Sequence, residues 1–199
     1  MQKRYKIRTM TSGDVDECHK VHLSLFPVKY SANEIANYCN SEYLSLIITT
    51  IEDEKEKIIG VSTTHRFWTS KFSYDRVSYL GTFGIIEEYR KKGLGTYLLR
   101  LTCKIIGSYY NCSRFSLHML RRNDLLHFYE NVGLDAIQVI PEYYGFTTPR
   151  PDAIIMSCDP RNIEFAINSR DDIDLDDEIK RMLNEKQAIG WLAPWFSKP

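Results

Sequence analysis

The chain has 199 residues, 43% of them hydrophobic, which suits one domain of about 150 residues with a short appendage. Its 26 Lys and Arg residues balance its 26 Asp and Glu residues, so the formal net charge is zero. Because a general nucleic-acid-binding protein carries a basic excess or stripe, this balance argues against that class, and we expect no nucleic-acid partner.

The cysteines and the apolar runs indicate the cellular compartment in which the protein is expected. The five cysteines are odd in number and include no Cys-x-x-Cys pair, which disfavours a zinc site and a disulfide framework and favours a reducing compartment. The first residues show no secretory signal, and no uncharged apolar run approaches the roughly 20 residues of a membrane-spanning helix. We therefore expect a cytoplasmic protein unless its tail anchors it.

Hydrophobic periodicity and turn residues predict an alternation of strands and helices. The first helix is expected to end before Pro27, and a charged turn at residues 52–57 joins two strands into a hairpin. In chain order we predict strand 4–10, helix 12–26, helix 33–39, strands 43–51, 58–67 and 77–86, a helix from residue 94, strand 114–120, helix 123–131, and strands 136–140 and 153–158. The fold class is therefore α/β in the broad α+β sense, a mixed sheet covered by helices.

The most informative segment is residues 85–99, which read as a strand end, a basic glycine loop and a helix start. Gly93 and Gly95 lack a Cβ atom, so each can adopt a positive φ and turn backbone N–H groups toward a ligand. The helix N-terminus adds unpaired N–H groups and a partial positive charge. Three cations precede it, so we expect an anion such as a phosphate to bind there. The helix itself should bury a stripe made of Leu94, Tyr97, Leu98, Leu101, Ile105 and Ile106.

Two familiar phosphate motifs do not fit this segment. A P-loop needs a lysine after its last glycine, and a dinucleotide fingerprint needs a third glycine where this chain has Leu98. The alternative that the basic residues form only a solvated turn is weakened by the strand before them and the helix after them.

The run from Tyr89 to Thr96 resembles the acetyl-CoA pyrophosphate loop of the GCN5-related N-acetyltransferase (GNAT) superfamily, whose pattern is Arg/Gln-x-x-Gly-x-Gly/Ala. Residues 26–30, 79–84 and 115–120 further resemble the NatE and NatF types of protein N-terminal acetyltransferase, and residues 141–144 fall where those enzymes carry paired tyrosines. The matches span about residues 4 to 158 in the family's order. The resemblance implies the GNAT fold, a mixed, mostly antiparallel central sheet with splayed strands, over residues 1–160.

The resemblance also implies acetyl-CoA as cosubstrate and no metal. Its pantetheine arm would pair with a strand as an extra strand does, near backbone N–H groups that stabilise an oxyanion; that strand comprises Gly81, Thr82, Phe83, Gly84 and Ile85. Its pyrophosphate would lie on Arg90, Lys91, Lys92, Gly93, Leu94, Gly95 and Thr96. The family usually places an asparagine seven residues before a coenzyme-contacting tyrosine. Here Asn123 precedes Tyr129 by six residues and Arg122 takes the seventh place, so either could make that contact.

Three side chains are candidates for the chemistry. A peptide α-amino group has a pKa of about 7.7 to 8.0, so a modest base suffices to deprotonate it. By resemblance, Tyr79 and His118 take the positions of the tyrosine and histidine that remove this proton, and Tyr129 that of the tyrosine that protonates the leaving thiolate. A structural histidine and a packed strand tyrosine are the plain alternatives.

Substrate choice is expected to come from two aromatic segments that resemble the peptide entrance of these enzymes. They would hold the peptide backbone through tyrosine hydroxyls and offer the first side chain an apolar slot, which suits an initiator Met. The alternative is that they are loop residues packed on the core. The candidate substrate-binding residues are Phe26, Pro27, Val28, Tyr30, Tyr143 and Tyr144.

Residues 161–199 form a C-terminal extension outside this pattern. An acidic run covers residues 171–177, and Ile173, Leu175, Ile179, Met182 and Leu183 fit a helical stripe. Aromatic residues follow at Trp191, Trp195 and Phe196. The resemblance to NatF-type enzymes implies contact with Golgi membranes through such a tail. Since the acidic run would be repelled by anionic lipid, docking on the chain's own domain or on a partner is favoured.

Together these features predict transfer of acetyl from acetyl-CoA to the N-terminal α-amine of proteins, Met-starting ones in particular, by direct attack in a ternary complex. A lysine (histone) or small-amine N-acetyltransferase is an alternative on the same fold. A non-catalytic acetyl-CoA-binding scaffold subunit is an alternative of another class. We expect a monomer that takes protein N-termini as substrates.

Overall fold

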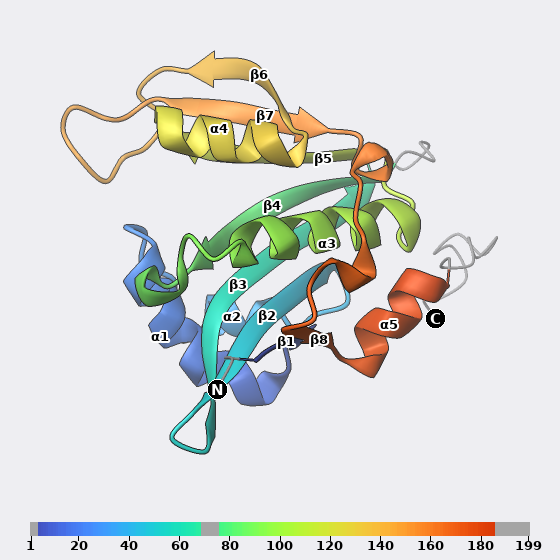
Figure 1. Ribbon diagram of the computed structural model, residues 1–199. Helices are drawn as coiled ribbons and strands as arrows, with labels where there is room; N and C mark the ends of the chain where they lie inside the picture. Colours follow the sequence, from blue (N-terminus) through green and yellow to red (C-terminus); the bar gives the residue numbers. More distant parts are fainter. Residues whose placement is uncertain (1–3, 69–75, 186–199) are drawn as a thin grey trace, which may run out of the picture.

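The structure, a computed structural model, describes residues 4–68 and 76–185 (Figure 1). The described strands are β1 (Tyr5–Thr9), β2 (Tyr43–Glu52), β3 (Lys55–Trp68), β4 (Arg76–Ile85), β5 (Arg114–Leu120), β6 (Asp135–Ile140), β7 (Ala153–Cys158) and β8 (Ile173–Leu175). The described α-helices are α1 (Val15–Leu25), α2 (Ala32–Asn37), α3 (Leu94–Ser108), α4 (Asn123–Val132) and α5 (Asp177–Asn184). Short 3-10 turns lie at η1 (Ser12–Asp14), η2 (Glu87–Tyr89), η3 (Pro160–Asn162) and η4 (Ile167–Ser169).

All eight described strands form one sheet in the order β6-β7-β5-β4-β3-β2-β1-β8. Strands β1 to β4 are antiparallel neighbours, β5 runs parallel to β4, and β7 and β6 continue antiparallel beyond β5. The hairpin between β2 and β3 turns at Asp53 and Glu54, both with positive φ. The sheet is thus mixed and mostly antiparallel, which confirms the predicted fold class.

The sheet separates two apolar layers because neighbouring strand residues point to opposite faces. On β2, Leu46 and Ile48 belong to the cluster under α3, whereas Ile47 belongs to the cluster under α1 and α2. The stripe of α3 is buried as predicted, and Tyr97, at 6%, is the most exposed of its six residues. Helix α3 is therefore fixed against the sheet, and its N-terminus points at the end of β4 (Figure 1).

Part of the C-terminal extension belongs to the same sheet and core. Strand β8 pairs in parallel with β1, and Ile179 and Met182 of α5 are buried in the cluster under α3. The predicted helical stripe is therefore wrong for Ile173 and Leu175, which lie in β8, and right for the residues of α5. Asp176 ends the strand and begins the helix, since its carboxylate accepts a hydrogen bond from the backbone N–H of Ile179 at 2.8 Å. The predicted tail aromatics at 191, 195 and 196 lie outside the described residues.

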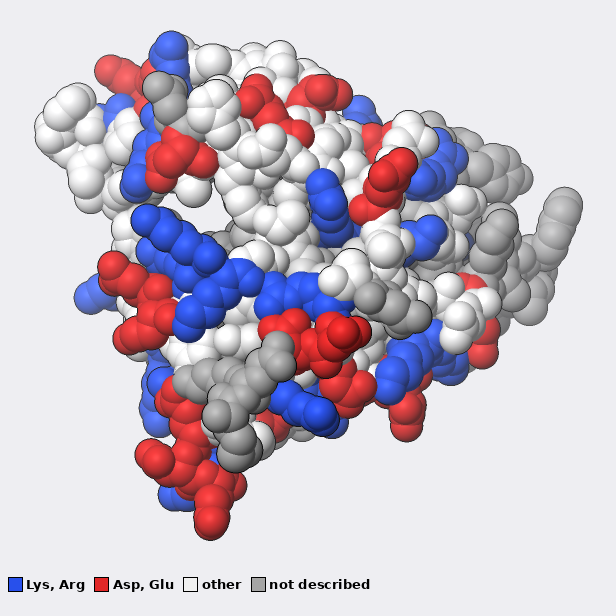
Figure 2. Space-filling model, viewed as in Figure 1, with Lys and Arg blue, Asp and Glu red and all other residues white. Residues whose placement is uncertain are grey.

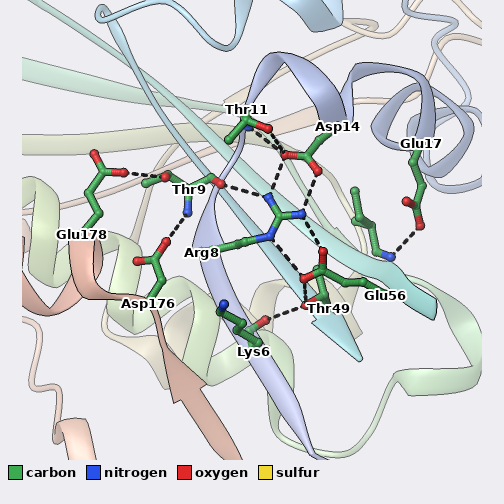
Figure 3. A network of polar contacts seen from close by, with 11 residues as sticks. Lys6, Arg8, Thr9, Thr11, Asp14, Glu17, Thr49, Glu56, Asp176 and Glu178 are labelled. Carbon is green, nitrogen blue, oxygen red and sulfur yellow. Dashed lines mark hydrogen bonds and ion pairs between the residues drawn. The ribbon is translucent and has the colours of Figure 1, made fainter. Parts of the chain in front are cut away.

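A polar network ties this extension and the β2–β3 hairpin to β1 (Figure 3). The Arg8 guanidinium donates to both oxygens of Asp14 at 2.7 Å and to Glu56 at 2.9 Å. Next to it, the Thr9 hydroxyl donates to Glu178 of α5 at 2.6 Å. The network joins the start of the chain to the turn before α1 and to the last described helix.

The ion pair between Arg8 and Asp14 predicts that the free energy of unfolding falls at acid pH. Burial alone would raise the pKa of Asp14, but hydrogen bonds from Arg8 and Thr11 outweigh it and lower that pKa from 3.8 to about 2. Its stabilising contribution is therefore complete above about pH 4 and is lost as the pH falls through about 2. We expect Asp14→Asn to lower the free energy of unfolding by about 2 kcal/mol at pH 7 and to flatten its decline between pH 4 and pH 2.

Urea unfolding of the wild type and of Asp14→Asn across this pH range measures the effect. Asp16→Asn is the matched control, since Asp16 is exposed in the first turn of α1 and should change both quantities much less than Asp14 does. If the free energy of unfolding of Asp14→Asn declines between pH 4 and pH 2 as steeply as that of the wild type, other carboxylates cause the decline.

Candidate active site

Strands β4 and β5 pair over a short stretch and then separate. Their parallel register runs from Val77 opposite Arg114 to Tyr79 opposite Ser116, whereas β4 continues to Ile85 and β5 to Leu120. Beyond Tyr79, the backbone N–H and C=O groups on the edge of β4 that faces β5 are not paired with β5. Figure 2 shows a gap at this side of the molecule, between the part that carries β5, β6, β7 and α4 and the rest.

A β-bulge lies where the strands separate. The register of β4 with β3 passes from Leu80 opposite Thr64 to Thr82 opposite Thr63, so Gly81 has no partner on β3. The extra residue reverses the alternation of faces: Leu80 lies in the cluster under α3, whereas Thr82 contacts α1 on the other face. The bulge thus presents the exposed backbone of Gly81 at the opening between β4 and β5.

His22 of α1 holds the strand just after this bulge, a contact that sequence reasoning missed. Its Nδ1 lies 2.7 Å from the Cys18 carbonyl, which can only accept, so Nδ1 carries the proton and Nε2 accepts from the Thr82 hydroxyl at 3.1 Å. Burial lowers the pKa of His22, which keeps the ring neutral. The only signal in the sequence was a histidine on the buried face of a helix. That pattern does not identify the residue that the histidine contacts.

The loop between β4 and α3 has the shape that an anion requires. Lys91 and Gly93 have φ values of 57° and 74°, and Gly93 immediately precedes the first turn of α3. Arg90 Nε donates to the Ile85 carbonyl at 2.8 Å, which ties the loop to the end of β4. The expectation of a positive φ at Gly95 is wrong, because Gly95 lies within α3. A Cβ atom there would instead lie 3.7 Å from Ile85 and Phe128.

Lys and Arg side chains gather around this loop. Figure 2 shows them beside the gap and continuing toward the middle of the same face. Arg90, Lys91 and Lys92 are exposed, and Lys92 Nζ lies 4.8 Å from the centre of the Tyr89 ring. The predicted loop cations therefore stand at the surface, beside the free N–H groups of the α3 N-terminus.

Tyr79 and His118 meet across the start of the opening. The Tyr79 hydroxyl lies 3.0 Å from Nδ1 of His118, and both side chains are half-buried. The His118 ring stacks on Tyr143 with centroids 4.7 Å apart and planes 5° apart. The predicted pair from two different strands is therefore a contacting pair, held in orientation by a third predicted residue.

The environment sets the protonation of this pair. Burial lowers the pKa of His118, so its imidazole is neutral at pH 7. Burial and the neighbouring Tyr143 raise the pKa of Tyr79, while the backbone N–H of His118 partly offsets them. At neutral pH a tyrosine hydroxyl thus faces a neutral imidazole, which is the arrangement of a proton relay.

Tyr129 is buried in α4, in contact with the cluster under α3. Burial raises the pKa of Tyr129, and Tyr144 raises it further, so the hydroxyl keeps its proton at neutral pH. Asn123 is the first residue of α4, and the Arg122 guanidinium is paired with Asp124 at 2.9 Å.

The aromatic segments predicted to form a peptide entrance lie together. Phe26 and Tyr30 contact each other with centroids 6.0 Å apart, and Tyr143 contacts Tyr144 at 4.9 Å. Burial raises the pKa of Tyr144, and the neighbouring Tyr79, Tyr143 and Tyr30 raise it further. Pro27, Val28 and Tyr143 are exposed. Within residues 4–68 and 76–185, no group of three or more His, Cys, Asp or Glu could hold a metal ion.

The profile of the acetyltransferase (GNAT) family matches residues 15–134. In an alignment over 160 residues, which covers 74% of this chain and 66% of the relative, the chain is 27% identical to a protein of Xenopus tropicalis named N-alpha-acetyltransferase 60. The chain therefore spans just under two thirds of that relative.

Two solved structures show the same fold. One is Arabidopsis thaliana NAA60 in complex with a bisubstrate analogue, with a TM-score of 0.70, 19% identity, and coverage of 77% of this chain and 97% of that one. The other is Arabidopsis thaliana Naa50 in complex with the bisubstrate analogue CoA-Ac-MVNAL, with a TM-score of 0.65, 22% identity, and coverage of 78% and 98%.

Proposed function

Because the chain belongs to the acetyltransferase (GNAT) family, we propose that it transfers the acetyl group of acetyl-CoA to the N-terminal α-amine of proteins. The observation that carries the proposal is the Tyr79 and His118 pair, which lies between the opening in the sheet and the aromatic entrance. A relative named N-alpha-acetyltransferase and a neighbour bound to a coenzyme–peptide conjugate support the choice of acceptor.

The described residues fit the coenzyme. The opening between β4 and β5 exposes the backbone from Gly81 onward, which can pair with the amides of a pantetheine arm. The loop at Gly93 and the N-terminus of α3 offer N–H groups to a diphosphate. A thioester supplies an activated acetyl group, so the protein has only to orient it, exclude water and move protons.

We propose that Tyr79 and His118 move one proton together. In the tautomer that carries the ring proton on Nε2, His118 Nδ1 accepts the hydrogen bond from the Tyr79 hydroxyl. As Tyr79 gives this proton to His118, its oxygen accepts one from the incoming ammonium, directly or through a water molecule. Tyr129, whose raised pKa preserves its proton, is the acid for the leaving sulfur.

The entrance favours a peptide end over a lysine side chain. Tyr30, Tyr143 and Tyr144 present hydroxyls that can hold a peptide backbone, while Phe26 and Val28 offer apolar surface to a first Met. The peptide part of the analogue bound to the Naa50 neighbour, MVNAL, also begins with Met.

The test is an acetylation assay on short peptides with free and blocked N-termini, with coenzyme release monitored. We expect release with free Met-starting peptides and a loss of at least 100-fold when the same peptides are blocked. Release from blocked peptides that carry an internal lysine, with none from free Met-starting ones, would instead support the lysine alternative.

We also propose that the enzyme acts in the cytoplasm, which the five free cysteines support. Contact of the C-terminal extension with Golgi membranes stays a prediction, and the aromatic residues of this extension at 191, 195 and 196 lie outside the described part. In the described residues, no helix has the length and apolar character needed to span a membrane.

A further inference from the structure

The chain that follows β7 crosses α3 on its way to β8 (Figure 1). We call residues 161–170 the strap. The strap lies beyond residues 15–134, which match the family profile. Its start is fixed at close range, since a Cβ atom added to Gly107 of α3 would lie 2.8 Å from the backbone of Pro160 and Arg161. Its end is fixed by the pairing of β8 with β1.

A cavity of about 770 Å³ lies between the strap and α3. It begins at Gly93 and Thr96, which belong to the candidate phosphate loop and the first turn of α3, and extends along α3 to Lys104. Its size is typical of sites for small organic ligands. The cavity therefore continues the phosphate site on the side away from the sheet.

The charged side chains that line this cavity are mostly cationic. Arg100 and Lys104 come from α3, Arg161 and Arg170 come from the strap, and Glu164 is the acidic lining residue. In the described part of the chain, the buried Nε of Arg100 has no hydrogen-bond partner. The Nη2 of the same guanidinium donates to the Asn131 carbonyl of α4 at 2.9 Å, which holds Arg100 at the cavity, and a buried donor without an acceptor is unfavourable.

Arg170 connects the cavity to the loop. Its Nη1 donates to the Lys92 carbonyl at 2.5 Å, and Nε and Nη2 donate to Asp172 at 2.9 and 2.5 Å. Asp172 thus fixes the guanidinium plane against the loop beside Gly93, where an added Cβ would lie 3.1 Å from Nη1. A cation held in this way acts on whatever the loop binds.

Aromatic side chains cover one side of the cavity. The ring of Phe165 in the strap meets the ring of Tyr97 edge to face with centroids 5.0 Å apart, and the Tyr97 hydroxyl donates to the Ile167 carbonyl at 3.0 Å. Phe165 is half-buried, so part of its ring is open to a ligand. Cations beside an exposed ring suit a ligand with both phosphate and a flat base.

We propose that the strap and α3 together bind the 3′-phosphoadenosine end of coenzyme A, an inference that rests on the proposed function. With the diphosphate on the loop and the pantetheine arm directed at β4, the ribose leaves the loop on its other side, where the cavity begins. The 3′-phosphate carries nearly two negative charges at pH 7 and meets Arg100 and Lys104, which lie four residues apart on α3, while the adenine meets Phe165. Arg170, held against the loop, acts on the diphosphate. The C-terminal extension thus completes the coenzyme site.

Calorimetric titration of the full chain with coenzyme A and with 3′-dephospho-coenzyme A tests this proposal. We expect the wild type to prefer coenzyme A by about tenfold or more, since the missing group makes several charge-assisted contacts. Lys104→Gln and Arg100→Gln should each reduce that preference by about threefold or more. Arg170→Gln should weaken both ligands alike, because both carry the diphosphate that the loop binds. The matched control is Lys180→Gln, which removes an exposed cation of α5 outside the cavity and should leave the preference unchanged.

The decisive quantity is the ratio of the two dissociation constants, because a merely structural loss weakens both ligands equally. Thermal unfolding confirms that each variant is folded. Equal binding of the two ligands by the wild type, or an unchanged ratio in both Lys104→Gln and Arg100→Gln, would overturn the proposal while leaving coenzyme binding intact. A wild type that binds neither ligand would overturn the proposed function as well.

Discussion

Replacing Tyr79 by Phe is expected to lower kcat by about 100- to 10,000-fold, with little change in the KM for acetyl-CoA. The variant keeps the ring but removes the hydroxyl that lies 3.0 Å from His118 Nδ1. His118→Ala should produce a loss of similar size, because either change interrupts the same relay. The double variant should therefore be little worse than either single one. Steady-state kinetics with a Met-starting peptide measure all three.

The pH profile gives a second readout of the same pair. His118 must be neutral to accept a proton, so activity falls as the pH drops through its pKa, which burial lowers below the usual 6.5. The α-amine of the substrate also titrates, at about pH 7.7 to 8.0, which gives the pH profile of activity a second, upper limb. We expect His118→Ala to lose the lower limb and keep the upper one.

Matched controls separate chemistry from structure. Tyr109→Phe removes a hydroxyl at the far end of α3, which accepts a hydrogen bond from Arg181, and His127→Ala removes an exposed ring of α4. Both should retain wild-type turnover. If Tyr79→Phe and His118→Ala stay folded and also retain turnover, the pair is structural and the relay is wrong. A wild type that binds coenzyme but turns over no amine would favour the scaffold alternative.

Gly93→Val is expected to raise the dissociation constant of acetyl-CoA by about 10- to 100-fold. The native φ of 74° is in the left-handed region, which a β-branched residue strongly disfavours, and a Cβ atom would lie 3.1 Å from Arg170. The loop should relax to a conformation that no longer directs its N–H groups at the diphosphate. At saturating acetyl-CoA, kcat should change much less, because Tyr79 and His118 are untouched.

Gly13→Ala is the matched control for this substitution. Gly13 has no positive φ, and an added Cβ would lie 3.7 Å from the Thr11 hydroxyl, an ordinary contact. Equilibrium titration of acetyl-CoA should give wild-type affinity for this control. Wild-type affinity for Gly93→Val would mean that the loop conformation does not determine coenzyme binding.

Local pattern was enough to place most of the elements and the loop. Alternating β-branched residues and the apolar stripe of α3 each depend on neighbours in sequence, so they predicted β2, β3 and α3 closely. The Tyr79 and His118 pair came from resemblance, since nothing in the spacing of two residues 39 apart indicates that their strands become neighbours. The structure brings them into contact through the parallel pairing of β4 and β5.

The features that were missed depend on tertiary contacts. The helical stripe through Ile173 and Leu175 was wrong because strand pairing with β1 overrides a weak helical pattern in a short acidic segment. The glycine motif predicted the loop and the positive φ of Gly93 correctly but was wrong for Gly95, which serves close packing inside α3. The Thr82 contact of His22 and the cavity under the strap join segments far apart in sequence.

The most direct test of the central claim uses one peptide with two competing amines. A Met-starting peptide with a free N-terminus and an internal lysine is incubated with the enzyme and acetyl-CoA, and tandem mass spectrometry locates the acetyl group. The geometry at Tyr79, His118 and the aromatic entrance predicts acetyl on the α-amine of Met, and its loss with Tyr79→Phe. Acetyl on the lysine side chain with the α-amine left free would contradict the account.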